Sequence, residues 1–127
     1  MRLPSILTAG LIAAAATIAA VAPAQASCFY NQSEVANIGV KLDCGWFCSN
    51  KWSIPKGDHN CRGGKGGPFW IDAVGKNDSF YLEGSVRDHG YVTVTGSCQA
   101  GIRAQIYAED HSLRREVYAP GPLTDCR

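Results

Sequence analysis

The chain has 127 residues, with 12 Lys and Arg against 11 Asp and Glu, and its formal net charge is +1 at pH 7. Without Arg2 the two counts become equal. General nucleic-acid binding and cationic membrane lysis both depend on excess positive charge, so the composition argues against both classes and we expect no nucleic-acid partner.

The first 26 residues have the pattern of a secretory signal peptide. Arg2 gives a positive start, residues 6–22 are apolar, and Ala24-Gln25-Ala26 forms a small-x-small cleavage site. A membrane anchor is the alternative, but the apolar run is short for a hydrocarbon core of ~30 Å and no basic stop-transfer cluster follows it. We predict cleavage after Ala26 and a secreted, extracellular protein of residues 27–127 that forms one domain and has no membrane attachment.

Six cysteines follow the predicted cleavage site: Cys28, Cys44, Cys48, Cys61, Cys98 and Cys126. An even number in a short exported chain predicts three disulfides, although the sequence cannot select their pairing. As a working hypothesis we pair Cys28 with Cys126, which would join the two ends of the domain. A zinc site needs two cysteine pairs at ligand spacing, and only Cys44-x-x-x-Cys48 provides one. We therefore expect no metal and no cofactor.

The first predicted strand lies at residues 38–43, where Ile38, Val40 and Leu42 alternate with polar residues or glycine. The segment Cys44–Pro68 follows and shows neither helical nor strand periodicity. It is rich in cysteine, glycine and cationic side chains, and we expect a long loop segment that cross-links hold in shape. A helical turn is expected at most within residues 45–51.

Period-two alternation dominates the rest of the chain and predicts strands near residues 69–74, 80–87, 91–95, 102–109 and 113–118. Turn residues separate these runs, and Asp88-His89-Gly90 is typical of a hairpin turn in which Gly90 is free to adopt a positive φ. Several short strands at regular spacing without a helical pattern predict an all-β fold, a small disulfide-stapled β-sandwich or barrel.

The segment Cys44–Pro68 also contains the candidate binding residues. Tryptophan beside cationic side chains is typical of surfaces that stack on sugars or anchor protein partners. The candidates are Trp46, Lys51, Trp52, Arg62 and Lys65. Our preferred interpretation is a non-enzymatic, effector-like protein that binds an extracellular or host partner, either a protein or a glycan. The alternative for the two tryptophans is that they cover the disulfides as a small second core.

Two other functions stay open. One is an antimicrobial or competition toxin, against which the near-neutral charge counts. The other is a small ribonuclease-like hydrolase that uses Glu83 as base, His89 as acid and Arg87 for charge stabilisation. The same residues occur on ordinary solvated sheet faces, and the chain lacks a nucleophile motif, so we assign no catalytic residue.

Two sequons, Asn31-Gln-Ser33 and Asn77-Asp-Ser79, match the N-glycosylation pattern. The sequence does not show whether Asn31 or Asn77 carries a glycan.

Overall fold

The computed structural model describes residues 26–46, 48–74 and 80–124. These residues form nine β-strands and no helix. The strands are β1 (Ala26–Asn31), β2 (Asn37–Asp43), β3 (Ser49–Pro55), β4 (His59–Gly63), β5 (Gly67–Ala73), β6 (Tyr81–Val86), β7 (Tyr91–Ser97), β8 (Gly101–Tyr107) and β9 (Leu113–Pro120). No helix that could cross a bilayer is present in this part of the chain.

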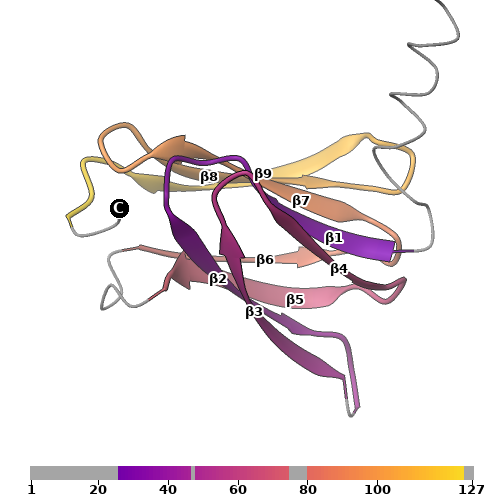
Figure 1. The fold of residues 1–127 in the computed structure, drawn as a ribbon. Helices are drawn as coiled ribbons and strands as arrows, with labels where there is room; N and C mark the ends of the chain where they lie inside the picture. Colours follow the sequence, from indigo (N-terminus) through magenta and orange to yellow (C-terminus); the bar gives the residue numbers. More distant parts are fainter. Residues whose placement is uncertain (1–25, 47, 75–79, 125–127) are drawn as a thin grey trace, which may run out of the picture.

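The strands form two stacked sheets, which Figure 1 shows as an upper and a lower layer. The five-stranded sheet has the order β4-β1-β7-β8-β9, and the four-stranded sheet has the order β3-β2-β5-β6. Strands β1 and β7 run parallel, and the other neighbours are antiparallel. The predicted all-β sandwich is confirmed.

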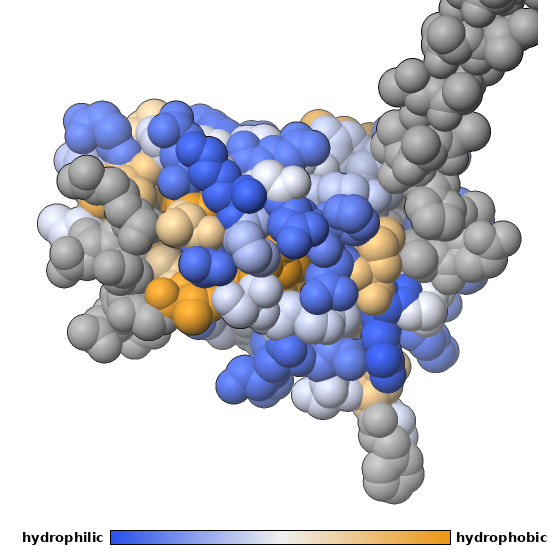
Figure 2. All heavy atoms as spheres, viewed as in Figure 1, coloured by the Kyte–Doolittle hydropathy of each residue, from blue (hydrophilic) through white to orange (hydrophobic). Residues whose placement is uncertain are grey.

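The core lies between the two sheets and follows the period-two pattern. Ile38, Val40 and Leu42 of β2 are at most 2% exposed and belong to one buried cluster with residues of β7 and β8. Phe29 of β1 packs edge-on against Phe69 of β5, with ring centroids 5.4 Å apart. Hydrophilic residues cover most of the face that Figure 2 shows, as expected when alternate strand residues point outward.

The segment Cys44–Pro68 differs from the expected loop, because it contains β3 and β4. The expectation that no hydrogen-bonded ladder holds it is wrong, since β3 pairs with β2 along its whole length and β4 pairs with β1. Both strands lie at the edge of their sheets. An edge strand buries fewer side chains, and in β3 only Ile54 is fully buried, so the apolar alternation was too weak to reveal a strand. Residues 45–46 form a tight turn rather than a helical one, with Gly45 at φ 111°.

Two disulfides join the described cysteines. Cys28 of β1 bonds to Cys61, its direct neighbour on β4, with the two Cα atoms 4.0 Å apart. The hypothesis that Cys28 pairs with Cys126 is therefore wrong, because the β1–β4 pairing brings Cys61 opposite Cys28. Cys44 bonds to Cys48 and closes the β2–β3 turn. Cys98 is also disulfide-bonded, and Cys126 lies outside the described residues.

The turn between β6 and β7 uses its residues differently from the prediction. His89 has the positive φ of 61°, and Gly90 does not. Gly90 is required for packing instead, since a Cβ atom there would lie 2.5 Å from the Tyr107 carbonyl oxygen and 3.0 Å from that of Arg87.

Asn31, at the end of β1, connects the two sheets through its buried side chain. Its Nδ2 atom donates to the carbonyl oxygens of Val35 and Ile54, each at 3.0 Å, and Ile54 belongs to the opposite sheet. Its Oδ1 atom accepts hydrogen bonds from the backbone N–H and the hydroxyl of Ser33. A side chain with 0% exposure and both ends bonded cannot carry a glycan in the folded domain, so this sequon is structural. Asn77 lies outside the described residues.

We expect Asn31→Ala to lower the free energy of unfolding by at least ~2 kcal/mol. The substitution leaves two buried carbonyl oxygens without their donor, at about 1–3 kcal/mol for each unsatisfied group. Urea denaturation measures the change, and Gln32→Ala at the exposed neighbouring position is the control. Equal stability of the two variants would contradict the role of Asn31.

A peptide map of non-reduced protein should recover Cys28 linked to Cys61 and Cys44 linked to Cys48. Cys126 is then the one cysteine left in the sequence for Cys98, and we expect those two in a third linked peptide pair. A peptide that links Cys28 to any other cysteine would refute the β1–β4 register.

Candidate functional site

The outer face of the four-stranded sheet presents two parallel rows of side chains. They lie on this face because their neighbours along each strand, such as Val40 and Ile71, point into the core. The strand register sets the order within each row. The first row contains Lys51, Lys41, Trp70 and Glu83, and the second contains Ser53, Gly39, Asp72 and Tyr81.

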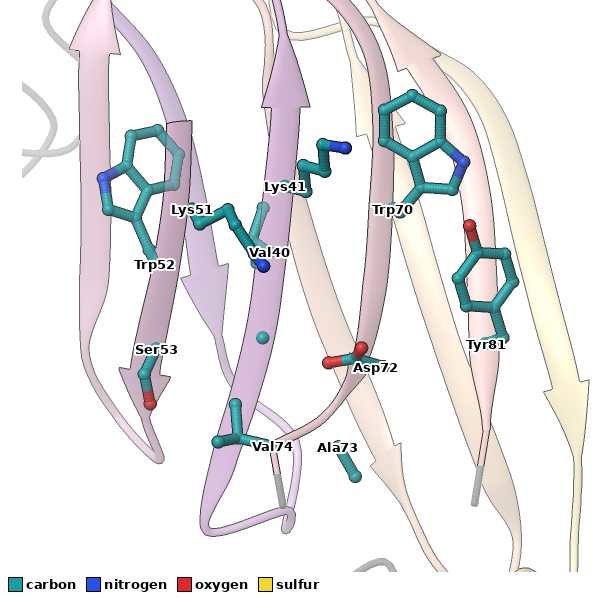
Figure 3. A pocket seen from close by; sticks show the side chains of 11 residues that line it. Val40, Lys41, Lys51, Trp52, Ser53, Trp70, Asp72, Ala73, Val74 and Tyr81 are labelled. Atoms are coloured by element: carbon teal, nitrogen blue, oxygen red, sulfur yellow. The ribbon is translucent and has the colours of Figure 1, made fainter. Parts of the chain in front are cut away.

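A groove of about 770 Å³ runs over these rows (Figure 3). Its volume lies within the range of about 300–1,000 Å³ that small-molecule sites occupy. Gly39 contributes to its lining without a side chain, and a Cβ atom there would collide with Oδ1 of Asp72. The glycine therefore makes room for the Asp72 carboxylate. Figure 3 shows Lys41 extending toward the Trp70 ring and the hydroxyl end of Tyr81 directed toward the same ring.

The two lysines of the groove are the main feature of its electrostatics. Lys41 and Lys51 lie directly opposite each other on β2 and β3, an arrangement in which like charges repel. The Nζ atom of Lys41 lies 5.4 Å from the centre of the Trp70 ring, within the range of a cation–π contact. The ion pairs found among the described residues involve neither lysine. The groove therefore carries two positive charges that no carboxylate of the described chain neutralises by direct contact.

Trp70 also lines a second, smaller hollow of about 240 Å³ toward β6. Glu83 and Arg115 lie in that hollow. The Trp70 indole thus lines both the groove and this smaller hollow. A chain-like ligand that occupied both would lie along the indole.

The outer face of the five-stranded sheet differs because its polar groups bond to one another. Arg103 donates to Glu116 at 3.0 Å, and Gln105 donates to the second oxygen of Glu116 at 2.8 Å. The hydrogen bond from Gln105, together with the Arg103 guanidinium, lowers the pKa of the Glu116 carboxyl below its ordinary value. Arg103 also lies 4.0 Å from the centre of the Tyr118 ring. On this face Arg103 and Glu116 thus neutralise each other within the protein.

A row of aromatic rings crosses the same face, and its rings are turned toward one another. Tyr91 and Tyr107 stack at 4.8 Å, and Tyr30 stacks on His59 at 5.3 Å. The Tyr91 hydroxyl lies 3.0 Å from Nδ1 of His111. Stacked rings present their edges to solvent, and a sugar needs an exposed ring face, so this row fits a stabilising role within the sheet.

The predicted binding residues occupy several parts of the structure. Trp46 is 90% exposed at the β2–β3 turn, while Arg62 and Lys65 are exposed on β4 and the loop after it. Lys51 and Trp52 both line the groove. The Trp52 ring is half-buried and lies 5.8 Å from Phe29, so it also belongs to the edge of the core.

Five polar or aromatic residues of the groove were not predicted from the sequence: Lys41, Ser53, Trp70, Asp72 and Tyr81. Because Trp70 and Tyr81 alternate along their strands with the core residues Ile71 and Leu82, the sequence already placed both on the outer face. The missing information was the strand order, which brings β2, β3, β5 and β6 side by side.

The weak catalytic candidates are not assembled into one site. Glu83 lies in the hollow beside Trp70, whereas Arg87 lines a different hollow with Asp88 and Asp110. The backbone N–H of His89 donates to the Gly64 carbonyl oxygen at 2.7 Å, which ties the glycine-rich loop to the β6–β7 turn. The described part of the chain contains no group of three or more His, Cys, Asp or Glu side chains that could hold a metal ion.

No protein-family model, curated protein or solved structure matches this chain.

The tyrosines provide a test of the stacked row, because burial raises the pKa of Tyr30 and Tyr91 above the ordinary value of 10.0. The folded state favours the neutral form of both phenols. Their contribution to the stability of the fold is therefore fully present below pH 10 and is lost as the pH rises through the raised pKa values. An ultraviolet titration of the folded protein should show tyrosine ionisation that continues above the pH range of the urea-unfolded chain. Tyr91→Phe should reduce this late ionisation. Titration curves of the folded and unfolded protein that coincide would contradict the half-buried, stacked row.

Proposed function

We propose that this is a secreted, non-enzymatic binding protein that holds an extracellular carbohydrate chain on the outer face of its four-stranded sheet. The observation that carries the proposal is the groove, in which an indole, hydroxyl groups, a carboxylate and two ammonium groups stand side by side on paired strands. Side chains on a sheet are held more rigidly than side chains on loops, which suits recognition without a large ordering cost.

Carbohydrate is the ligand class whose chemistry matches these groups best. A sugar ring has a face of C–H groups that packs on an aromatic ring, and an edge of hydroxyls that needs donors and acceptors. In the groove, Trp70 and Tyr81 supply the aromatic surface. Asp72 supplies acceptors, and the Ser53 hydroxyl supplies both a donor and an acceptor.

Secretion is supported by two features that arise independently. The N-terminal residues have the signal-peptide pattern, and the domain contains disulfides, which persist mainly in oxidising compartments.

Binding is favoured over hydrolysis by the distribution of titratable groups. The hydrolase hypothesis needs the base Glu83 and the charge-stabilising Arg87 at one scissile bond, and these two residues line separate hollows. Among the described residues that line the groove there is one carboxylate, Asp72, and no histidine. A glycosidase of the usual kind needs a pair of carboxyl groups.

A glycan array probed with the folded secreted protein tests the proposal. We expect specific binding, and we expect Trp70→Ala to weaken it by at least about 30-fold, since an aromatic anchor contributes ~2 kcal/mol or more. Trp46→Ala is the matched control, because it removes the same ring from the exposed hairpin turn. Melting curves of both variants establish that each remains folded.

Two results would contradict the proposal. Loss of binding in Trp46→Ala with full binding in Trp70→Ala would move the recognition surface to the β2–β3 turn. Shortened glycan or RNA products that disappear in Glu83→Gln or His89→Ala would make the protein a hydrolase.

A further inference from the structure

We infer that the groove is built for an anionic carbohydrate, a chain that bears carboxylate or sulfate groups, with Lys41 and Lys51 as the anion-binding pair. This inference rests on the proposed function and adds the charge of the ligand to it.

The two lysines repel each other, and no carboxylate of the described residues relieves that repulsion. They are direct cross-strand neighbours, and the ion pairs of the described residues leave both without a carboxylate. Like charges in this position destabilise a sheet. An anion that bridges the two ammonium groups would replace this repulsion with two attractions.

Lys41 places a positive charge beside the Trp70 ring. The two residues are direct neighbours on β2 and β5, with the ammonium 5.4 Å from the ring centre. A sugar that packs on the indole would therefore have a cation at its edge. An acidic substituent on that sugar meets the lysine pair, whereas a neutral sugar leaves both charges unsatisfied.

The cationic groups and the hydroxyl-binding groups occupy different rows of the groove. The row next to the lysines contains Ser53, Gly39, Asp72 and Tyr81, so the positive end is followed by groups that bind hydroxyls. Anion and hydroxyl recognition at adjacent positions suits an acidic sugar chain better than an acidic peptide, which has carboxylates but few hydroxyls.

The contrast with the opposite face strengthens the assignment. There, Arg103 is neutralised by Glu116 and stacks on Tyr118. A cation–aromatic pair thus occurs on both faces. Among the described residues, the cation on the five-stranded face also binds a carboxylate, whereas Lys41 in the groove does not.

The test is a titration of the secreted protein with four polymers, followed by tryptophan fluorescence and calorimetry. Polygalacturonate carries carboxylates, dextran sulfate carries sulfates, dextran is neutral, and poly-glutamate is an acidic peptide. We expect binding of one or both anionic polysaccharides, with affinity that falls as salt rises toward ~0.15 M because screening weakens charge pairs. The comparison of the first two polymers identifies the anionic group.

The Lys41→Gln, Lys51→Gln double variant should bind the anionic polysaccharide at least tenfold more weakly. Lys56→Gln with Arg114→Gln is the matched control, because it removes the same charge from exposed positions in the β3–β4 turn and on β9 of the other sheet. The control should bind like the unmodified protein. Melting temperatures should stay unchanged or rise in the groove variant, since it relieves a repulsion.

Each other outcome overturns a different statement. Equal binding of dextran and polygalacturonate, both lost in Trp70→Ala, would refute the anionic ligand and leave the carbohydrate function intact. Binding of poly-glutamate alone would refute the carbohydrate function, because the partner would be an acidic protein. Equal losses in the groove variant and the control variant would show general electrostatic attraction and refute the site. Absence of binding to both anionic polysaccharides would also refute the inference.

Discussion

The hydrogen bonds of the Asn31 side chain are the constraint on which much of this sandwich depends. A sandwich of two sheets needs something besides apolar contact to fix how the sheets align, because hydrophobic packing is not directional. Asn31 supplies that direction by donating from β1 to the carbonyl oxygen of Ile54 on the opposite sheet. Its backbone N–H also donates to the Asp58 carbonyl oxygen in the β3–β4 turn. A single residue thus connects the five-stranded sheet, the four-stranded sheet and the turn that joins β3 to β4.

The sequence was sufficient to predict the sandwich and most of its central strands, because strands buried on one face leave a period-two pattern. It was insufficient for β3 and β4, which are edge strands whose burial is partial. It was also insufficient for the partner of Cys28, since the pairing depends on the β1–β4 register and not on chain separation. Asn31 illustrates the same limit, because its sequon is visible in the sequence while its burial is set by contacts with residues far along the chain.

The groove was hidden from the sequence for a related reason. Lys41, Lys51 and Trp70 belong to three strands, and each is unremarkable within its own segment. Only the order β3-β2-β5 makes them neighbours in one row. Tryptophan next to lysine in the sequence suggested a binding surface at residues 51–52, yet alternation turns Trp52 toward Phe29 while Lys51 points outward. The cation that accompanies the half-buried Trp70 indole of this face is Lys41, on the neighbouring strand.

The two outer faces show why unmatched charge is more informative than exposed aromatic area. Both faces carry aromatic rings and cations, so composition alone does not separate them. On the five-stranded sheet the rings stack on one another and Arg103 is held by Glu116. On the four-stranded sheet the two opposed lysines lower the stability of the fold. A substitution at either surface position would easily remove this destabilisation. The disulfides and the Asn31 hydrogen bonds provide stability from which such a cost can be met. Local disagreement between a sequence and the stability of its fold is expected where a ligand supplies the missing partner, and we propose the lysine pair beside Trp70 as that place.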